Sequence, residues 1–216
     1  MMAAPIEGAS PRRRHLPVTD IRQSGFLAQA AAVVESNLSM TEPPYNVLFL
    51  GTGNTARSIL AESILRKLGA GRFNAFCAGS QPKGVVNPVA LQVLEALDYP
   101  TEGLRSKSWQ EFAAPGAPQM HFIITVCDNA AGESCPVWPG KLAAAHWGIA
   151  DPAAVDVGDT RKMRAFTEAF HHLKDRIAAF VALPIDRLDP VSLSVALREI
   201  GRLDGATALA GGSAHD

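Results

Sequence analysis

The strongest constraint on the fold is a continuous apolar run, Val47-Leu48-Phe49-Leu50, that leads directly into a glycine-containing turn. Four consecutive apolar residues are typical of a strand that is covered on both faces, as in a parallel sheet. After the turn, apolar residues recur at helical spacing and predict a helix from Ser58 to Leu68. A strand, a tight turn and a helix in this order indicate the start of an α/β domain.

The same alternation continues along the chain. We expect strands from Phe73 to Cys77 and from Phe122 to Val126, and a helix from Pro88 to Leu97 with proline in its first turn. A long helix follows, with one apolar stripe that faces the sheet. The stripe consists of Met163, Phe166, Phe170, Leu173, Ile177 and Phe180. The prediction is an α/β fold with a parallel sheet and helices on both faces.

The chain divides into three parts. Residues 1–44 begin with a segment rich in Pro, Arg and small residues, which we expect to be disordered, and continue into an amphipathic helix. A targeting peptide is the alternative for this extension. Residues 45–183 form the α/β domain. In 184–216, Asp189-Pro190 predicts the start of a short helix, and a disordered tail follows. That helix could pack on the domain, on the N-terminal helix, or on a second subunit in a homodimer.

Composition excludes several classes of protein. The 216 residues include 20 basic and 21 acidic ones, for a net charge of −1, so there is no electrostatic reason to expect nucleic acid or a membrane surface as partner. Every apolar stretch is far shorter than the roughly 20 residues that span a bilayer. Three cysteines argue against a secreted disulfide scaffold. We therefore expect a cytoplasmic protein.

The turn after the first strand is the candidate site. A turn that leads into a helix N-terminus directs several backbone N–H groups at one point, and Arg57 can add a bidentate fork for a tetrahedral oxyanion. An ordinary strand-to-helix turn remains the alternative. Gly51-x-Gly53-x-x-Ala56 also matches a dinucleotide fingerprint, but the second strand ends in Phe76-Cys77-Ala78-Gly79-Ser80, without the carboxylate that binds a ribose.

The segment Asn46 to Ser58, NVLFLGTGNTARS, resembles the oxyanion loop of low-molecular-weight tyrosine phosphatases and of the arsenate reductases that share their fold. In that family the loop reads Cys-x5-Arg. Arg57 falls on the arginine, and Gly51 falls on the nucleophilic cysteine. The resemblance implies a three-layer sandwich of this type, with helical N- and C-terminal extensions. It also implies an oxyanion-binding loop made of Thr52, Gly53, Asn54, Thr55, Ala56, Arg57 and Ser58, in which Asn54 braces the loop through its side-chain amide.

Further motifs resemble the thiol-coupled arsenate reductases. Cys127 and Cys135-Pro136 are followed by His146-Trp147 and Asp151-Pro152. In that branch the loop thiol attacks arsenate, and the residue at Asp151 donates a proton to the leaving oxygen. A thiol at Cys127 then releases arsenite and closes a disulfide with Cys135. The resemblance implies arsenate, phosphate or sulfate as ligands and an external thiol reductant of the thioredoxin type, with no bound cofactor and no metal.

Residue chemistry alone leaves alternatives open. Cys127 and Cys135 could be buried thiols or part of a metal site, for which His146 is one further ligand. Cys77, between Phe76 and Ala78, is predicted to be a core thiol. An aspartate before proline, such as Asp151, is usually a turn or cap residue.

Gly51 raises three hypotheses, because glycine has no side chain to attack arsenate. The first hypothesis is that the chain is an arsenate reductase in which glycine has replaced cysteine. The second is that it is an inactive oxyanion-binding or regulatory module. The third hypothesis is an enzyme whose nucleophile is Cys127 or a partner's thiol. A relative of the tyrosine phosphatases is a further alternative.

Overall fold

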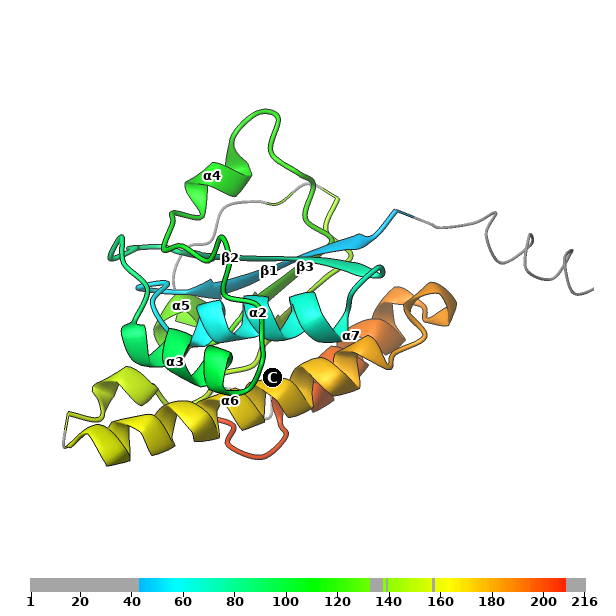
Figure 1. Cartoon of the computed structure of the whole chain (residues 1–216). Coiled ribbons are helices and arrows are strands. Elements are labelled where there is room, and N and C mark those ends of the chain that lie inside the picture. The colour runs from blue at the N-terminus through cyan, green and yellow to red at the C-terminus, as the bar shows by residue number, and fades with distance from the viewer. Residues whose placement is uncertain (1–42, 133–137, 139, 157, 209–216) are drawn as a thin grey trace, which may run out of the picture. The chain divides into compact units, whose positions relative to one another are not determined.

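The computed structural model describes residues 43–132, 138, 140–156 and 158–208 (Figure 1). The expected N-terminal helix, Cys135 and the tail after residue 208 lie outside the described residues.

Four parallel strands form the sheet. They are β1 (Tyr45–Gly51), β2 (Phe73–Gly79), β3 (Phe122–Thr125) and β4 (Ala143–His146), in the order β2-β1-β3-β4. The strand β1 is therefore paired on both sides, which explains its continuous apolar sequence. We did not predict β4, because Ala-Ala-Ala-His lacks the β-branched residues and the alternation that mark a strand.

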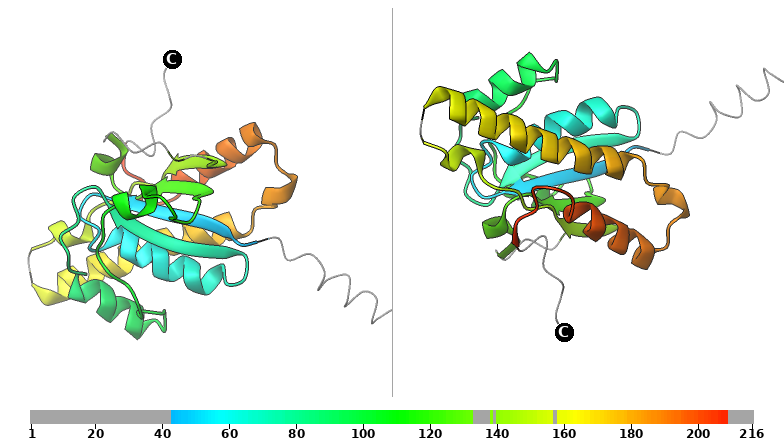
Figure 2. Two further views of the ribbon diagram at one scale, coloured as in Figure 1. Left: turned by 90° about the horizontal axis from the view of Figure 1, so that it is seen from above. Right: turned by 90° about the horizontal axis from the view of Figure 1, so that it is seen from below.

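Most of the long helices lie on one side of the sheet, and Figures 1 and 2 show the resulting layers. They are α2 (Arg57–Leu68), α3 (Pro88–Ala96), α6 (Asp159–Val181) and α7 (Pro190–Gly201). The other face carries the short helix α4 (Gln110–Ala113) and the segment after it. A five-residue helix, α5 (Asp128–Gly132), follows β3, and single 3-10 turns occur at Pro152–Ala154 and Ile185–Arg187.

The cores follow the pleat of β1. Val47 and Phe49 pack into the larger core with the long helices, whereas Leu48 and Leu50 face the smaller core around Met120. Because alternate side chains of a strand point to opposite faces, the strand is buried on both sides and its end is held firmly in place. The turn that follows Leu50 is therefore built on a strand that is paired along both edges and buried on both faces.

Two helices begin at side-chain caps, of which the one at Asp189 was predicted from the sequence. The Asn87 side chain accepts from Val89 N at 2.9 Å ahead of α3, and Asp189 accepts from Val191 N at 2.9 Å ahead of α7. The helix α7 packs on the domain itself, against β4 and α6. No helix among the described residues is long and apolar enough to cross a bilayer.

The apolar stripe of α6 needs one correction. Five of its predicted members are buried, but Met163 is 36% exposed. The helix begins at Asp159, and none of its residues before Phe166 is buried, so its first turns extend past the core. Helical spacing identifies the apolar stripe but not how far the core reaches along it.

Candidate functional site

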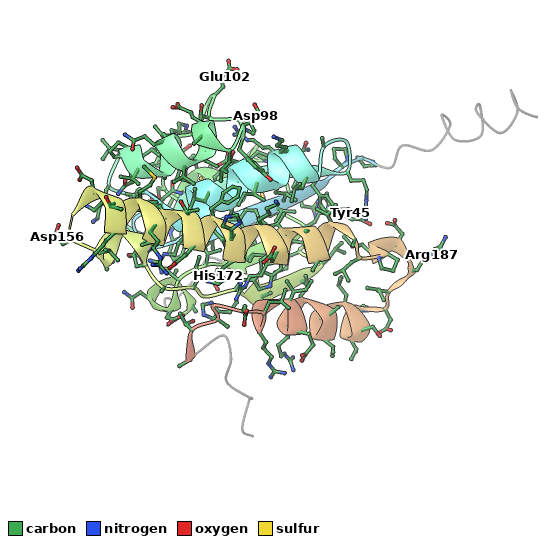
Figure 3. The ribbon with its side chains drawn as sticks, turned by 60° about the horizontal axis from the view of Figure 1, so that its bottom comes forward. Tyr45, Asp98, Glu102, Asp156, His172 and Arg187 are labelled. Carbon is green, nitrogen blue, oxygen red and sulfur yellow. The ribbon has the colours of Figure 1, made fainter. Side chains whose placement is uncertain are left out.

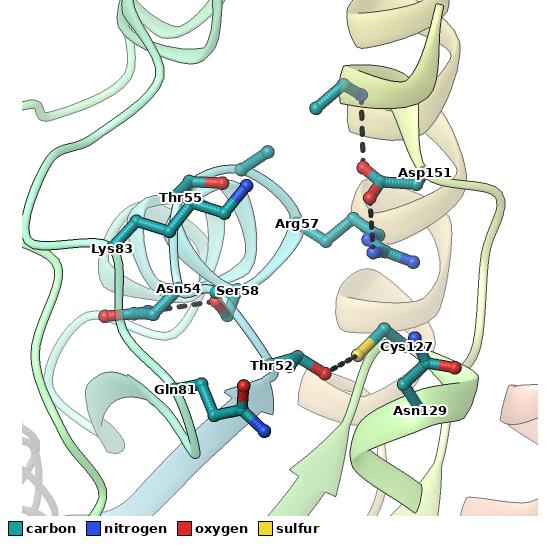
Figure 4. Close-up of a pocket in the computed structure, with 14 residues that line it drawn as sticks. Thr52, Asn54, Thr55, Arg57, Ser58, Gln81, Lys83, Cys127, Asn129 and Asp151 are labelled. Atoms are coloured by element: carbon teal, nitrogen blue, oxygen red, sulfur yellow. Dashed lines mark hydrogen bonds and ion pairs between the residues drawn. The ribbon is translucent and has the colours of Figure 1, made fainter.

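The turn between β1 and α2 forms one wall of a pocket (Figure 4). Its residues, 51–58, are joined there by Cys127 from the end of β3 and by Asp151 from the segment after β4. The carboxyl ends of parallel strands meet at one edge of a sheet, which brings these distant segments together. The lining residues are Gly51, Thr52, Gly53, Asn54, Thr55, Ala56, Arg57, Ser58, Gln81, Lys83, Cys127, Asn129, Asp151 and Ala153.

Backbone hydrogen bonds fix the orientation of the turn. The segment after β2 donates to its carbonyl groups, from Gln81 N to Thr52 O at 3.0 Å and from Lys83 N to Gly53 O at 3.1 Å. The Thr55 carbonyl accepts from Asn87 N at 2.9 Å. Among the described residues, none accepts a hydrogen bond from the N–H groups of residues 52–57. With its carbonyls engaged elsewhere, the turn presents its N–H groups as donors for an anion.

The Asn54 side chain links the turn to α2 and to residue 107. Its side chain donates to Ser58 Oγ at 3.0 Å and accepts from Lys107 N at 2.8 Å, and the residue is only 2% exposed. Its φ of 46° lies in the left-handed region, which asparagine tolerates better than most residues. The side-chain hydrogen bonds hold the backbone in this unusual conformation.

Gly51 leaves room for a side chain. A Cβ atom placed on it would lie 3.4 Å from Ser58 Oγ and 4.0 Å from Cys127 Sγ, which are ordinary contact distances. Its φ is outside the left-handed region that favours glycine. A residue with a Cβ atom therefore fits at this position, and the backbone does not require glycine.

Arg57 and Asp151 are paired across the pocket. Arg57 Nη2 lies 2.9 Å from Asp151 Oδ2, and Arg57 Nη1 donates to Ile149 O at 3.0 Å. Asp151 has the extended backbone expected before Pro152, and its side chain accepts from Ala153 N at 3.1 Å. It is thus a cap residue as well as a pocket residue, with 43% of its side chain exposed. The pair holds a cation and a carboxyl group together beside the turn.

The two described cysteines differ in environment. Cys77 is fully buried, and burial together with nearby Glu62 raises the pKa of its thiol to about 12, as expected for a core thiol. Cys127 is 3% exposed, but its sulfur lines the pocket 3.5 Å from Thr52 Oγ1. Cys135 lies outside the described residues, so the predicted Cys127–Cys135 pair stays a prediction.

Sequence reasoning missed Gln81, Lys83 and Asn129. The Lys83 side chain lies along Gly53, where a Cβ atom would be 3.5 Å from Lys83 Cε, and its amine adds positive charge at the mouth of the pocket (Figure 4). The available signal was position, because Lys83 follows β2 at the edge of the sheet where β1 also ends.

His146 and Trp147 have structural contacts. The ring nitrogens of His146 lie 2.8 Å from Thr125 Oγ1 and 2.9 Å from Asp128 Oδ1, and buried Trp147 donates to Leu197 O at 2.9 Å. No group of three or more His, Cys, Asp or Glu in the described part of the chain could hold a metal ion.

A profile of the low molecular weight phosphotyrosine protein phosphatase family matches residues 46–189. The chain belongs to this family. It is 27% identical over 134 residues to an arsenate reductase of Oceanobacillus iheyensis. The aligned residues make up 62% of this chain and 93% of that protein. The family assignment confirms the resemblance found in the sequence and the predicted α/β fold.

Solved structures agree with this fold. An arsenate reductase of Archaeoglobus fulgidus shares 25% identity at a TM-score of 0.50, covering 63% of this chain and 99% of that one. An arsenate reductase in its phosphate binding state has a TM-score of 0.51 at 23% identity, covering 64% and 97% respectively. Both solved structures share the fold of this chain, and its curated relatives include proteins named arsenate reductases.

Proposed function

We propose that this chain is an arsenate reductase-like protein that binds a free tetrahedral oxyanion, arsenate, phosphate or sulfate, at residues 52–58. The observation that carries the proposal is the turn itself, whose N–H groups have no acceptor among the described residues and whose last residue is Arg57. These donors do not depend on a thiol at position 51. Binding therefore survives the replacement of cysteine by glycine, even though the usual first step of reduction does not.

The lining favours an inorganic anion over a phosphorylated tyrosine. None of the described residues that line the pocket is aromatic, so a phenyl ring would have no ring to stack on. The charged groups at the pocket are Arg57, Lys83 and Asp151. Without a thiolate at Gly51, one negative charge is absent from beside the bound anion, so the repulsion between that charge and the anion is removed.

Cys127 supports a second candidate function, arsenate reduction with this thiol as the nucleophile. Its sulfur lies 4.0 Å from the place where a Cβ atom of residue 51 would be, in the same pocket as Arg57. The thiolate would form a bond to arsenic while water leaves with a proton from Asp151. A second thiol, from Cys135 or an external thioredoxin-type donor, would then attack Cys127 Sγ and release arsenite. Two thiols become one disulfide as arsenic(V) is reduced to arsenic(III).

Calorimetric titration with phosphate and arsenate tests the binding proposal. Arg57→Ala should weaken binding about 10- to 100-fold, because it removes a charge-assisted hydrogen-bond donor. Arg164→Ala is the matched control, since Arg164 is exposed on α6 and pairs with Glu168. Equal affinity in the wild type and the Arg57→Ala variant would contradict the proposal.

Arsenite formation tests the second candidate separately. The unmodified chain is incubated with arsenate and a thioredoxin system, and arsenite is measured. Turnover that Cys127→Ser abolishes would establish Cys127 as the nucleophile. Binding without any turnover would leave this chain as an oxyanion-binding protein.

A further inference from the structure

The residues that follow α7 return to the candidate site. We call residues 202–208 the C-terminal strap; they lie beyond the segment, 46–189, that matches the family. Ala206 pairs with Ile149 in an isolated antiparallel bridge, and Thr207 N donates to Gly148 O at 3.0 Å. The strap is the red segment after α7 in the two views of Figure 2. It thus contacts the segment that leads from β4 to Asp151.

The beginning of the strap is fixed by α6. The guanidinium of fully buried Arg176 donates to three carbonyl groups at the end of α7 and in the strap, on Gly201, Leu203 and Asp204. Gly205, with a φ of 78°, packs against the ring of His172 on α6, which is labelled in Figure 3. These contacts define where the strap leaves α7 and where its next residues go.

The other end of the strap reaches Asp128. Thr207 Oγ1 donates to Asp128 Oδ1 at 2.6 Å, and His146 Nε2 lies 2.9 Å from the same oxygen. Asp128 directly follows Cys127 and is the first residue of α5. A carboxylate held by two partners fixes the start of this helix, and with it the position of the Cys127 sulfur in the pocket.

Gly148 is the point where the strap, α5 and β4 meet. A Cβ atom there would lie closer than 3.0 Å to Thr207 Oγ1, Asp128 Oδ1 and His146 Nε2, so a side chain at this position would displace these three groups. The next residue, Ile149, accepts the hydrogen bond from Arg57 Nη1 at 3.0 Å. The strap is therefore linked to both sides of the pocket. It contacts Asp128, the neighbour of Cys127, and it contacts the Gly148–Ile149 backbone, which binds Arg57.

We infer that the C-terminal strap is a positioning element of the oxyanion site and that Thr207 is its positioning residue. Thr207 touches no ligand and acts through Asp128 and Gly148. Its effect on oxyanion affinity rests on the proposed function, but its effect on Cys127 does not. The two consequences can therefore be measured separately.

Thr207→Val tests the inference in the full-length chain, because valine keeps the shape of threonine and removes its hydroxyl. The rate of Cys127 alkylation by iodoacetamide, followed by peptide mass spectrometry, should rise about fivefold, the factor that corresponds to one lost hydrogen bond of about 1 kcal/mol. Phosphate affinity should fall by a similar or smaller factor. Thr207→Ser, which restores the hydroxyl, should return both values toward those of the wild type.

Three controls make the result decisive. The alkylation rate of buried Cys77 reports opening of the protein core, and this rate should stay unchanged. Thr167→Val removes a hydroxyl that donates to Met163 O on the surface of α6. This substitution should change the alkylation rate of neither cysteine. Asp128→Ala removes the acceptor of the Thr207 hydrogen bond. Thr207→Val added to this variant should therefore not change the alkylation rate of Cys127 any further.

Several outcomes would overturn the inference. One is an unchanged alkylation rate of Cys127 in Thr207→Val, and another is an equal rise in the alkylation rate of Cys77. Equal alkylation rates of Cys127 in the serine and valine variants would also overturn it, as would additive effects of the Thr207 and Asp128 substitutions on that rate. If the wild type binds no phosphate, the proposed function fails, and the alkylation rates still decide the role of the strap.

Discussion

Gly51 lies at the end of β1 with backbone angles that do not require glycine, and its nearest neighbours leave space for a Cβ atom. The groups that would activate a thiol at this position are already present. They include the unengaged N–H groups of the turn, the start of α2 and Arg57, all of which stabilise a nearby negative charge. The turn is therefore equipped for thiol chemistry that its own residue 51 cannot perform.

We predict that Gly51→Cys creates a reactive thiolate. Its pKa should lie well below the usual value of about 8.5, because the N–H groups and Arg57 stabilise the charged form. Absorbance of the thiolate at 240 nm gives the pKa, with Gly51→Ser as the matched control. The variant should also reduce arsenate with a thioredoxin system, and Cys127→Ser added to it should stop arsenite release. A folded Gly51→Cys protein that binds arsenate but consumes no reductant would show that the site lacks more than its thiol.

Cys77 gives a prediction about alkaline pH. Its folded-state pKa is raised to about 12, so the unfolded chain loses this proton first, above about pH 9. The free energy of unfolding should therefore decrease by about 1.4 kcal/mol per pH unit from about pH 9 toward 12, through this group alone. Urea unfolding of the wild type and of Cys77→Ala at pH 8 and pH 10 measures it. Identical pH slopes in the two proteins would refute the assignment.

Among the elements, α6 and α7 depend on a single buried cation. Arg176 on α6 is 0% exposed and donates to backbone carbonyls of Gly201, Leu203 and Asp204, and burial lowers the pKa of its guanidinium. Arg176→Met should lower the free energy of unfolding by about 3 kcal/mol, because it leaves the buried carbonyl of Gly201 and the partly buried carbonyls of Leu203 and Asp204 without this donor. Chemical denaturation checks this value, with Arg164→Met on the exposed side of α6 as control. Equal losses in both variants would mean that the carbonyl contacts contribute nothing.

Element type was predictable where a periodic pattern and a cap coincided. Pro88 and Asp189-Pro190 signalled α3 and α7, and the spacing from Phe166 to Phe180 signalled α6. The strand β4 was not predictable, because its alanines are placed in a sheet by pairing with β3 and not by their own preference.

The same contrast holds for the site. Residues 51–58 are contiguous, so the motif could be recognised in the sequence alone. Lys83 lines the pocket because of the position of β2 in the sheet. Thr207 contacts Asp128, next to Cys127, because of the path of the chain after α7. No local pattern marks them, since each depends on contacts between segments that are distant in the sequence.

For the molecule as a whole, oxyanion binding should appear as increased stability. Phosphate at 100 times its dissociation constant should add about 2.7 kcal/mol to the free energy of unfolding, because only the folded state assembles the turn. The measurement is the thermal midpoint in phosphate and in sodium chloride of equal ionic strength, which separates specific binding from screening. The phosphate effect should be absent in Arg57→Ala, and an equal shift in that variant would point to a different binding site.

Gly51 and Gly79 are register partners across β1 and β2, yet they differ in what they allow. A Cβ atom on Gly79 would collide with the backbone oxygen of Thr52 and with Asn54, so a side chain there would displace the turn. A Cβ atom on Gly51 would make only ordinary contacts with its neighbours. Because glycine and cysteine codons can differ by one base, a gene of this kind can lose or regain its nucleophile in one mutational step without passing through an unfolded protein. The glycine beside it has no such freedom, because a side chain at position 79 would push against the backbone of the turn.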